Sequence, residues 1–464
     1  MLVDVIMAQA QALQSLQESH DSLKAQLSEY ADRMDKVERR QHRQAAPFGR
    51  SEQSRKPSSS HKPSGRKKGH KGNYRQPPSQ VDFRQEVPLE GCPLCGGQLS
   101  GLEAVEQYIE ELPIVRPVVH HITTYRARCC VCKQQVCSRH PLQVSEATGA
   151  AGSHLGPRAQ AVCLALMHNY SLSKRKAAQL LEQFLGLKIS AGGLVHLAHR
   201  NAGKLASTRP ELLEQLQQSA CVHMDETGWY VGAPKHWLWV MTNQNASIYH
   251  VDERRNREVV NQLLGPQFSG VLVSDCLIAY QGVTDRQQKC YAHHLKAISL
   301  AMEKRAIEAK VQEKPPDTAL DYLRQVRTLL HAALHIGKLW RQDLLSDHQV
   351  QQARQRLKDQ AELLLVPSKD NNIDEKIANR LRKQRQYLFT FLEDKRVDAT
   401  NNLAERQLRP AVITRKISCG NKTQKGAQSW ATIKSVITSF SQQGRDFTHF
   451  LVQLLPLHQP VPFI

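Results

Sequence analysis

Three acidic residues that lie far apart in the sequence have the chemistry of a divalent-metal site. Asp225 lies within an alternating, strand-like run, Asp275 ends an apolar run, and Glu405 follows two asparagines in Thr400-Asn-Asn-Leu-Ala-Glu405. Adjacent carboxylates repel one another unless a cation lies between them, and Mg²⁺ prefers oxygen ligands. Two such ions about 3.5–4 Å apart activate a water or a 3′-hydroxyl for attack on a phosphodiester. The three acids are therefore predicted to be catalytic ligands of Mg²⁺ or Mn²⁺.

Each acid also has a structural explanation. Asp225 and Asp275 could be polar residues at strand ends. Asn402 and Glu405 fit the capping-box pattern of a helix start, which needs no metal. The occurrence of all three in a strongly basic chain favours the metal site.

Clustered cysteines indicate a second, structural metal site. Six of the eleven cysteines lie between positions 92 and 137, which is unlike a disulfide scaffold and typical of metal ligands. Two C-x-x-C pairs suit tetrahedral Zn²⁺, with strands such as 114–127 between them. The predicted zinc-ribbon ligands are Cys92, Cys95, Cys129 and Cys132, and the rival ligands are Cys130, Cys137 and His140. Cys290 and His293 are too few for a further site, so a hydrogen-bonding or packing role is expected for them.

The elements that must position the acids follow from the hydrophobic period. Three runs alternate apolar and polar residues, as in an antiparallel meander. A helix over 256–264 follows, and then an apolar run over 270–275 that suits a buried parallel strand. This order is the opening of a ribonuclease-H-like fold, with Asp225 and Asp275 on adjacent strands. The three predicted antiparallel strands are 221–231, 235–242 and 247–251.

The rest of the catalytic region is predicted to be helical. Helical periodicity with many Lys and Arg residues indicates an insertion at about 295–395 inside the ribonuclease-H-like domain. Its predicted helical stretches are 295–312, 317–346, 348–365 and 374–394. Residues 425–450 place five apolar side chains at helical steps, which predicts core: Trp430, Ile433, Val436, Ile437 and Phe440.

A helical region precedes the strands. Segments 173–181 and 190–200 flank a turn at 186–189, and Ser190 is a candidate N-cap. This layout fits a helix-turn-helix reader of DNA, and a plain helical hairpin is nearly as good an explanation. The basic residues predicted to contact DNA here are Lys174, Arg175 and Lys176.

The amino-terminal part consists of two segments that differ in composition. Residues 2–37 carry a heptad of mainly apolar residues, which predicts a coiled coil between chains; the alternative is a single amphipathic helix on its own domain. Residues 39–75 hold twelve basic residues and one acid, with almost nothing apolar, so this linker is predicted to be disordered and to bind phosphates. The alternative is a solvated linker of no consequence. Its predicted DNA contacts are Arg66, Lys67, Lys68 and Lys71.

The composition agrees with a DNA-binding role. The 464 residues include 63 Lys and Arg against 43 Asp and Glu, a net charge of +20, which favours polyanionic partners over small neutral metabolites. No apolar run approaches the roughly 18 residues of a membrane span, and no secretory signal pattern is present. We therefore expect a soluble, cytoplasmic protein.

Five motifs stand out: Met-Asp225-Glu-Thr-Gly-Trp, Val-Ser-Asp275, Thr-Asn-Asn-Leu-Ala-Glu405-Arg-Gln-Leu-Arg-Pro, Arg415-Lys-Ile-Ser and Gly420-Asn-Lys. Together they resemble the bacterial insertion-sequence-66 family of DDE transposases. The resemblance extends to the amino-terminal coiled coil, the basic Gly/His/Lys stretch, the zinc ribbon and the helical region, so it covers nearly the whole chain. It implies that the three acids form the catalytic triad. Many members carry an acid where this chain has Thr400.

The resemblance implies a transposase that binds the terminal inverted repeats of its element, cleaves a DNA strand and joins it to target DNA. Its partners would be double-stranded DNA, a second copy of the chain through the coiled coil, and possible accessory transposition proteins. Further phosphate contacts are expected from Arg406, Arg409, Arg415 and Lys416. The alternatives are a non-catalytic DNA-binding regulator with a degenerate nuclease fold, and a nuclease without strand transfer.

The expected architecture is multidomain, with α+β and α/β parts. The predicted domains are a coiled coil (1–40), a basic linker (41–82), a zinc ribbon (83–145), a helical DNA-binding region (150–215), the catalytic domain (216–445) and a tail (446–464).

Overall fold

The computed structural model describes residues 75–147, 152, 154–311, 318–366 and 374–456. The predicted coiled coil and the basic residues Arg66, Lys67, Lys68 and Lys71 lie outside these ranges. Within them, no helix has both the length and the apolar character that crossing a membrane requires.

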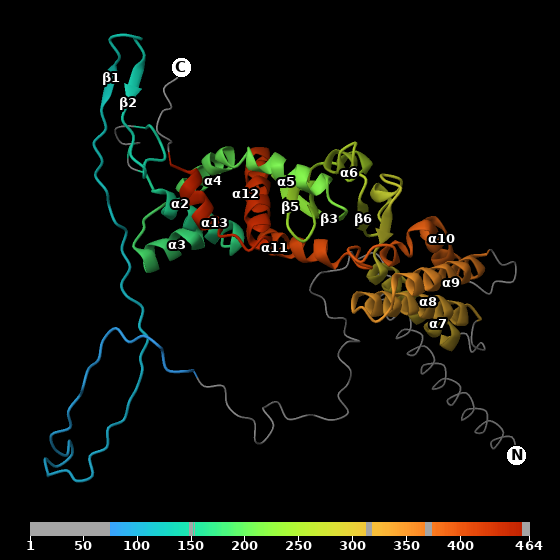
Figure 1. The fold of residues 1–464 in the computed structure, drawn as a ribbon, viewed down its shortest axis with the longest axis horizontal. Helices are drawn as coiled ribbons and strands as arrows, with labels where there is room; N and C mark the ends of the chain where they lie inside the picture. Colours follow the sequence, from blue (N-terminus) through green and yellow to red (C-terminus); the bar gives the residue numbers. More distant parts are fainter. Residues whose placement is uncertain (1–74, 148–151, 153, 312–317, 367–373, 457–464) are drawn as a thin grey trace, which may run out of the picture.

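A five-stranded mixed sheet forms the centre of the structure (Figure 1). Its order is β5-β4-β3-β6-β7; β3, β4 and β5 pair antiparallel, and β6 lies parallel to both β3 and β7. The predicted meander, helix and parallel strand are confirmed, whereas β7 was not predicted. The bounds are β3 Cys221–Val231, β4 Ala233–Thr242, β5 Ser247–Asp252, α6 Arg257–Leu264, β6 Val271–Ser274 and β7 Gln287–Lys289.

Alternation along the strands divides their side chains between two faces. Val222 and Met224 of β3 join a core with the helices that precede the sheet. Val271 and Val273 of β6 belong to another core, built with the helical insertion. The two sides of β6 thus contact different helical layers, because neighbouring residues of a strand point to opposite faces.

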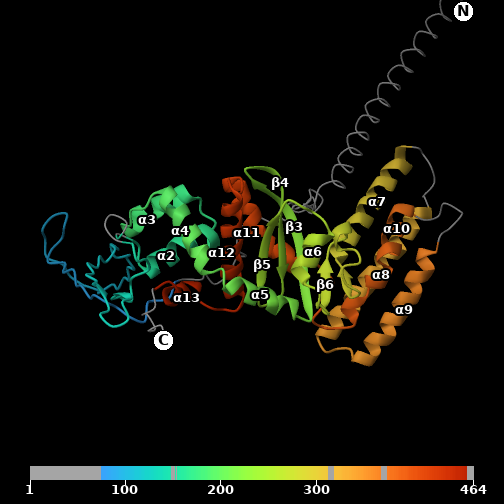
Figure 2. The ribbon, with the colours of Figure 1, turned by 90° about the horizontal axis from the view of Figure 1, so that it is seen from above.

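Helices between the sheet and Glu405 confirm the predicted insertion. They pack beyond β6 and lie together at one end of the structure (Figure 2). Ser346 forms a capping box with Gln349 at the start of one of them, as the Ser-x-x-Gln pattern favours. The bounds are α7 Tyr291–Val311, α8 Thr318–Arg341, α9 Asp347–Leu365 and α10 Glu375–Gln384.

The region before the sheet is helical, as predicted. Ser173 and Ser190 cap α3 and α4 by accepting hydrogen bonds from Lys176 N and Gly193 N. Gly186 ends α3 with φ +61°, a left-handed conformation that favours glycine. The bounds are α2 Pro157–Leu164, a π-helical turn Ala165–Asn169, α3 Lys174–Leu185, α4 Ala191–Lys204 and α5 Thr208–Gln217.

Three helices follow the insertion: α11 Asn402–Ser418, α12 Gln424–Gln442 and α13 Phe447–Leu454. The predicted core of α12 is confirmed, since Trp430, Ile433, Val436, Ile437 and Phe440 are all buried. The stretch from residue 446 is expected to be a tail, but α13 lies there and shares a core with α2. Its Leu451 is fully buried, which explains why this segment is held against the helical region.

The predicted strands over 114–127 are largely wrong. Regular structure in the cysteine-rich segment begins only at Arg126, where β1 (Arg126–Arg128) pairs antiparallel with β2 (Gln135–Cys137). Apolar side chains before it, such as Ile109 and Ile114, are exposed. Their apolar pattern therefore has no partner strand to pair with in this structure.

Candidate active site

Strand register brings Asp225 and Asp275 together. The parallel ladder between β3 and β6 ends at the pair His223 and Val273, and each aspartate lies two residues beyond that pair. Both aspartates follow the alternation of the buried Val271 and Val273, and therefore face the side of the sheet that the insertion covers. The two carboxylates that the sequence predicts as partners line one cavity, and the charge of Asp275 contributes to the raised pKa of Asp225.

Glu405 lies in the first turn of α11, which packs on β3 and β4. The helix begins at Asn402, and its N-cap is Asn401, whose side chain caps no helical N–H. The predicted cap at Asn402 is therefore wrong by one residue, and the capping box with Glu405 is not formed. The carboxylate of Glu405 instead lines a cavity shared with Asp225 and Asp275.

Asn401 joins the three segments that carry this site. It is fully buried, and its Nδ2 donates to the carbonyl of Met224, next to Asp225, at 2.8 Å. Its Oδ1 pairs with His223 Nδ1 at 3.3 Å, and its backbone N–H donates to Cys290 Sγ at 3.2 Å. Its own carbonyl accepts the N–H of Glu405 at 3.2 Å. One side chain thus fixes α11 relative to β3.

A cavity of about 910 Å³ surrounds the acids. One wall is formed by β3, the end of β6 and α11, and the opposite wall by α7 and α10 of the insertion. The insertion wall is basic and was not predicted residue by residue, although the Lys- and Arg-rich helices signalled it. Its basic residues are Lys296, Lys304, Arg305, Lys376 and Arg380.

The electrostatics of Asp225 fit a cation site. Burial raises its pKa well above the usual value, and the nearby charges of Glu226, Asp275 and Glu405 add to the shift. Among the described residues, neither Asp225 nor Asp275 has a basic side chain within ion-pair distance. A hard divalent ion bound there would lower this repulsion, and the oxygen donors match its preference.

Glu226 is satisfied by the protein itself. Its side chain is buried, and it accepts hydrogen bonds from Arg255 Nη2 at 2.7 Å and from the Tyr280 hydroxyl at 2.7 Å. Arg255 also stacks over the ring of Trp237, 4.2 Å from its centroid. These contacts give Glu226 a supporting role, in contrast to the neighbouring Asp225.

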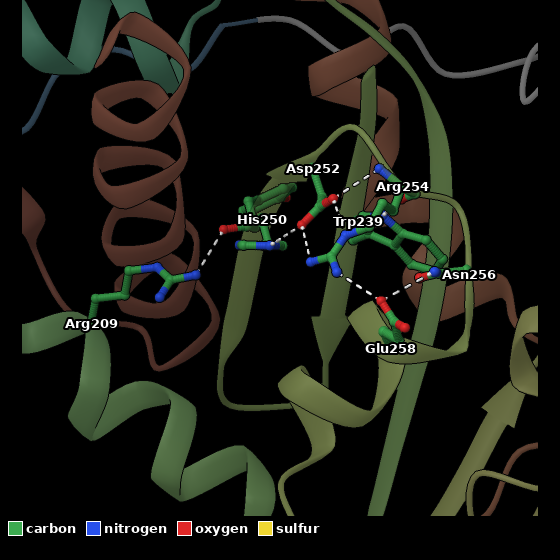
Figure 3. Close-up of polar contacts among 8 residues, drawn as sticks. Arg209, Trp239, His250, Asp252, Arg254, Asn256 and Glu258 are labelled. Atoms are coloured by element: carbon green, nitrogen blue, oxygen red, sulfur yellow. Dashed lines mark hydrogen bonds and ion pairs between the residues drawn. The ribbon is translucent and has the colours of Figure 1, made fainter. Parts of the chain in front are cut away.

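The loop that carries Arg255 is held by a polar network (Figure 3). Arg254 bridges Asp252, at the end of β5, and Glu258, in α6. Asn256 donates to Glu258 and His250 lies 3.5 Å from Asp252. The network fixes the β5–α6 connection from which Arg255 reaches Glu226.

Glu405 has a second set of neighbours. Among the described residues, the only group of three or more potential metal ligands whose atoms all lie within 4.8 Å of one another is Cys290, His293 and Glu405. Asp225, Asp275 and Glu405 line one cavity, but their carboxylate oxygens do not all lie within 4.8 Å of one another. A pair of ions separated by about 3.5–4 Å does not require all three carboxylates to meet at one point.

The basic residues predicted on α11 differ in their surroundings. Arg415 donates from Nη1 to the carbonyl of Gly228 and to Thr227 Oγ1, so it ties α11 to β3. Arg415 and Lys416 line the cavity. Arg406 and Arg409 are exposed on the helix surface.

The basic residues predicted in the helical region lie at the start of α3. Arg175 and Lys176 are exposed, and Lys174 is half-buried. Burial lowers the pKa of Lys174. These residues do not line the cavity of the acids.

The predicted zinc ligands form two separate turns. Backbone N–H groups of Leu94 and Cys95 lower the pKa of the Cys92 thiol, and those of Cys132 and Val131 lower that of Cys129. Each turn thus favours a thiolate. Among the described residues, the cysteines of the two turns do not form one group of metal ligands. In Figure 1 the β1–β2 hairpin lies apart from the blue segment that comes earlier in the sequence. The rival ligands Cys130, Cys137 and His140 join no such group either.

Comparisons with known proteins show what the chain as a whole is similar to. Residues 152–429, more than half of the chain, match the family model described as Transposase IS66 family. The uncharacterized protein y4qI of Sinorhizobium fredii is 25% identical over 271 residues, which cover 53% of this chain and 49% of that protein. The uncharacterized protein y4hP of the same organism is 28% identical over 210 residues, covering 42% and 37%. The chain thus matches about half or less of these relatives' length.

Proposed function

The chain belongs to the IS66 family of transposases, and from this premise we propose that it cleaves the ends of a DNA element and joins them to target DNA. The observation that carries the proposal is the arrangement of three carboxylates. Asp225 lies in β3, Asp275 directly follows the neighbouring parallel strand β6, and Glu405 lines the same cavity from α11. The proposed catalytic residues are these three acids.

The acids would hold the reaction's divalent ions, Mg²⁺ or Mn²⁺. Such ions, when bound, activate a water or 3′-hydroxyl and stabilise the charge of the leaving oxygen. Asp225 and Asp275 offer oxygens from one sheet edge, and Glu405 offers oxygens from the first turn of a helix. Asn401 and Arg415 keep α11 in register with β3 through their contacts with Met224 and Gly228.

The opposite wall of the cavity would bind the DNA backbone. Lys296 and Lys304 of α7 and Arg380 of α10 line this wall beside three acids, and Lys416 of α11 lines the wall that carries Glu405; the three acids of the basic wall are Glu308, Asp374 and Glu375. Lys and Arg are the side chains that contact phosphates without reading sequence. A phosphodiester bound between this wall and the acids would lie next to the groups that activate its attacker.

The finer architecture belongs to the same proposal. The strand order, with the meander antiparallel and β6 and β7 parallel to β3, supports a ribonuclease-H-like fold for the catalytic part. We propose a structural zinc ribbon at Cys92, Cys95, Cys129 and Cys132, which requires that metal binding brings the two turns together. Amino-terminal coiled-coil pairing would hold two element ends at once, and the place of action would be the bacterial cytoplasm at the nucleoid.

Strand cleavage and joining test the proposal directly. The full chain is given Mg²⁺ and a labelled duplex that carries the element's terminal repeat. We expect Asp225→Asn, Asp275→Asn and Glu405→Gln each to abolish cleavage while DNA binding persists. Glu308→Gln, which removes another acid of the same cavity, is the matched control and should cleave normally.

The outcomes separate the alternatives. Cleavage that persists in all three variants would overturn the catalytic assignment. Binding of the terminal repeat without any cleavage by the wild type would indicate a regulator. Cleavage without joining to a second duplex would indicate a nuclease that lacks strand transfer.

A further inference from the structure

Three side chains with different ligand atoms converge at one end of the cavity. Cys290 directly precedes α7, His293 lies in the first turn of α7, and Glu405 lies in the first turn of α11. One ligand atom of each lies within 4.8 Å of the others, and His293 Nδ1 is 4.0 Å from Glu405 Oε1. The sequence alone offered only the first two, which is why no site was predicted there.

The surroundings of these atoms suit metal coordination. Among the described residues, the buried Nδ1 of His293 has no hydrogen-bond partner, although a buried polar atom normally has one. Burial raises the pKa of the Cys290 thiol to about 12, and the backbone N–H that Asn401 donates to Sγ at 3.2 Å only partly offsets this; a bound metal ion would therefore have to displace the thiol proton. Cys290 also lies at the amino-terminal end of a long helix, where negative charge is stabilised.

We propose that Cys290, His293 and Glu405 form a binding site for a thiophilic divalent cation of the zinc class. Thiolate and imidazole ligands select zinc over magnesium, which prefers oxygen alone. Tetrahedral bonds of about 2.0–2.3 Å place ligand atoms roughly 3.4 Å apart, so the 4.0 Å between His293 and Glu405 must shorten by about 0.6 Å, and the pairs with Cys290, which lie within 4.8 Å, by at most about 1.4 Å.

The fourth position of this site faces the cavity. His293 and Glu405 line that cavity, whereas Cys290 is fully buried behind them. Three protein ligands leave one position for water or another small oxygen ligand, as in open zinc sites. The ion would enter from the cavity side.

The site also predicts inhibition of the proposed reaction, and this part rests on the proposed function. Glu405 lies within 4.8 Å of the ligand atoms of Cys290 and His293 but forms no such group with Asp225 and Asp275 among the described residues, so an ion held by Cys290 and His293 would draw Glu405 away from the two aspartates. An ion bound to the cysteine and histidine would therefore withhold Glu405 from the catalytic ions. Zinc would act as an inhibitor that excess magnesium relieves poorly, because magnesium competes weakly for sulfur and nitrogen ligands.

Metal content tests binding independently of any activity. Full-length wild type, Cys290→Ser and His293→Ala are loaded with zinc, dialysed and analysed for zinc per chain. Cys163→Ser, which alters another buried cysteine in α2, is the control for loss of a core thiol, and circular dichroism checks folding. We expect wild type and control to hold one zinc more per chain than either variant; equal zinc in all four would overturn the site.

Inhibition is tested by titrating zinc into cleavage reactions at fixed magnesium. Rates are normalised to each protein's own rate without added zinc. We expect the zinc concentration for half inhibition to be at least about 10-fold higher in Cys290→Ser and His293→Ala than in the wild type, and equal concentrations would overturn the competition for Glu405. A wild type that never cleaves would refute the proposed function, while the zinc content still decides the site.

Discussion

Asn401 offers a sharp test of how the site is positioned. In Asn401→Ala the side chain that links α11 to β3 is removed, while the backbone contacts with Cys290 Sγ and Glu405 N are retained. The lost interactions are the 2.8 Å hydrogen bond to the Met224 carbonyl and the 3.3 Å pairing with His223. Glu405 would keep its helix but lose its alignment with Asp225.

The magnitude follows from burial. Two hydrogen bonds contribute about 0.5–1.5 kcal/mol each, and a buried group left unpaired costs about 1–3 kcal/mol. We expect the free energy of unfolding to fall by about 2–4 kcal/mol. A displacement of a catalytic group by about 1 Å costs on the order of 100-fold in rate, so cleavage should fall about 100-fold.

Asn402→Ala is the matched control, because this neighbouring asparagine is exposed and lacks those contacts. Urea denaturation measures stability, and cleavage is measured at several Mg²⁺ concentrations at a temperature where both variants are folded. We expect Asn402→Ala to change stability by less than about 0.5 kcal/mol. Cleavage by Asn401→Ala within a few fold of wild type, or equal damage in Asn402→Ala, would refute the positioning role.

Three other predictions concern buried or bridging side chains. Burial lowers the pKa of Lys434 from 10.5 to about 8. Between about pH 8 and pH 10.5 the unfolded chain therefore binds more protons than the folded chain, and the free energy of unfolding should rise with pH. Lys434→Met should raise the free energy of unfolding by about 2 kcal/mol at pH 7 and remove this pH dependence, as measured by urea denaturation at several pH values. Burial likewise lowers the pKa of His223 from 6.5 to about 4, so stability should fall as pH drops through this window, and His223→Gln should move acid unfolding, followed by circular dichroism, to lower pH; an unchanged midpoint would contradict this. Arg415→Lys keeps the charge but cannot reproduce both contacts with Gly228 and Thr227. We expect DNA binding to hold in a gel-shift assay while cleavage falls about 10-fold, which corresponds to about 1.4 kcal/mol in activation free energy; equal cleavage would show that charge alone matters.

The sheet was largely predictable because its signals are local. The alternation in β3 and the apolar run of β6 each fix a strand and the face of its acid without knowledge of any partner. By contrast, β7 consists of Gln287, Gln288 and Lys289, all buried. Buried polar residues give no strand signal, so this strand depends on its tertiary neighbours.

The candidate site was predictable in its acids but not in its connections. Asn401 and Asn402 look alike in sequence, and only the structure shows that Asn401 is the buried residue before the helix, with its side chain bonded to Met224. The link between Cys290, His293 and Glu405 depends on two helix starts meeting in space. Apolar residues such as Ile114 predicted a strand that is not formed, because a strand-like pattern becomes a strand only when a partner strand is available.

Coordinates of the full chain bound to its terminal-repeat DNA with Mn²⁺, with the ions located by their anomalous scattering, would test the central claim most directly. The account predicts manganese between Asp225 and Asp275 next to the scissile phosphate, with Glu405 turned toward the same ions. Manganese bound elsewhere on the chain, with no ion in contact with either aspartate, would contradict it.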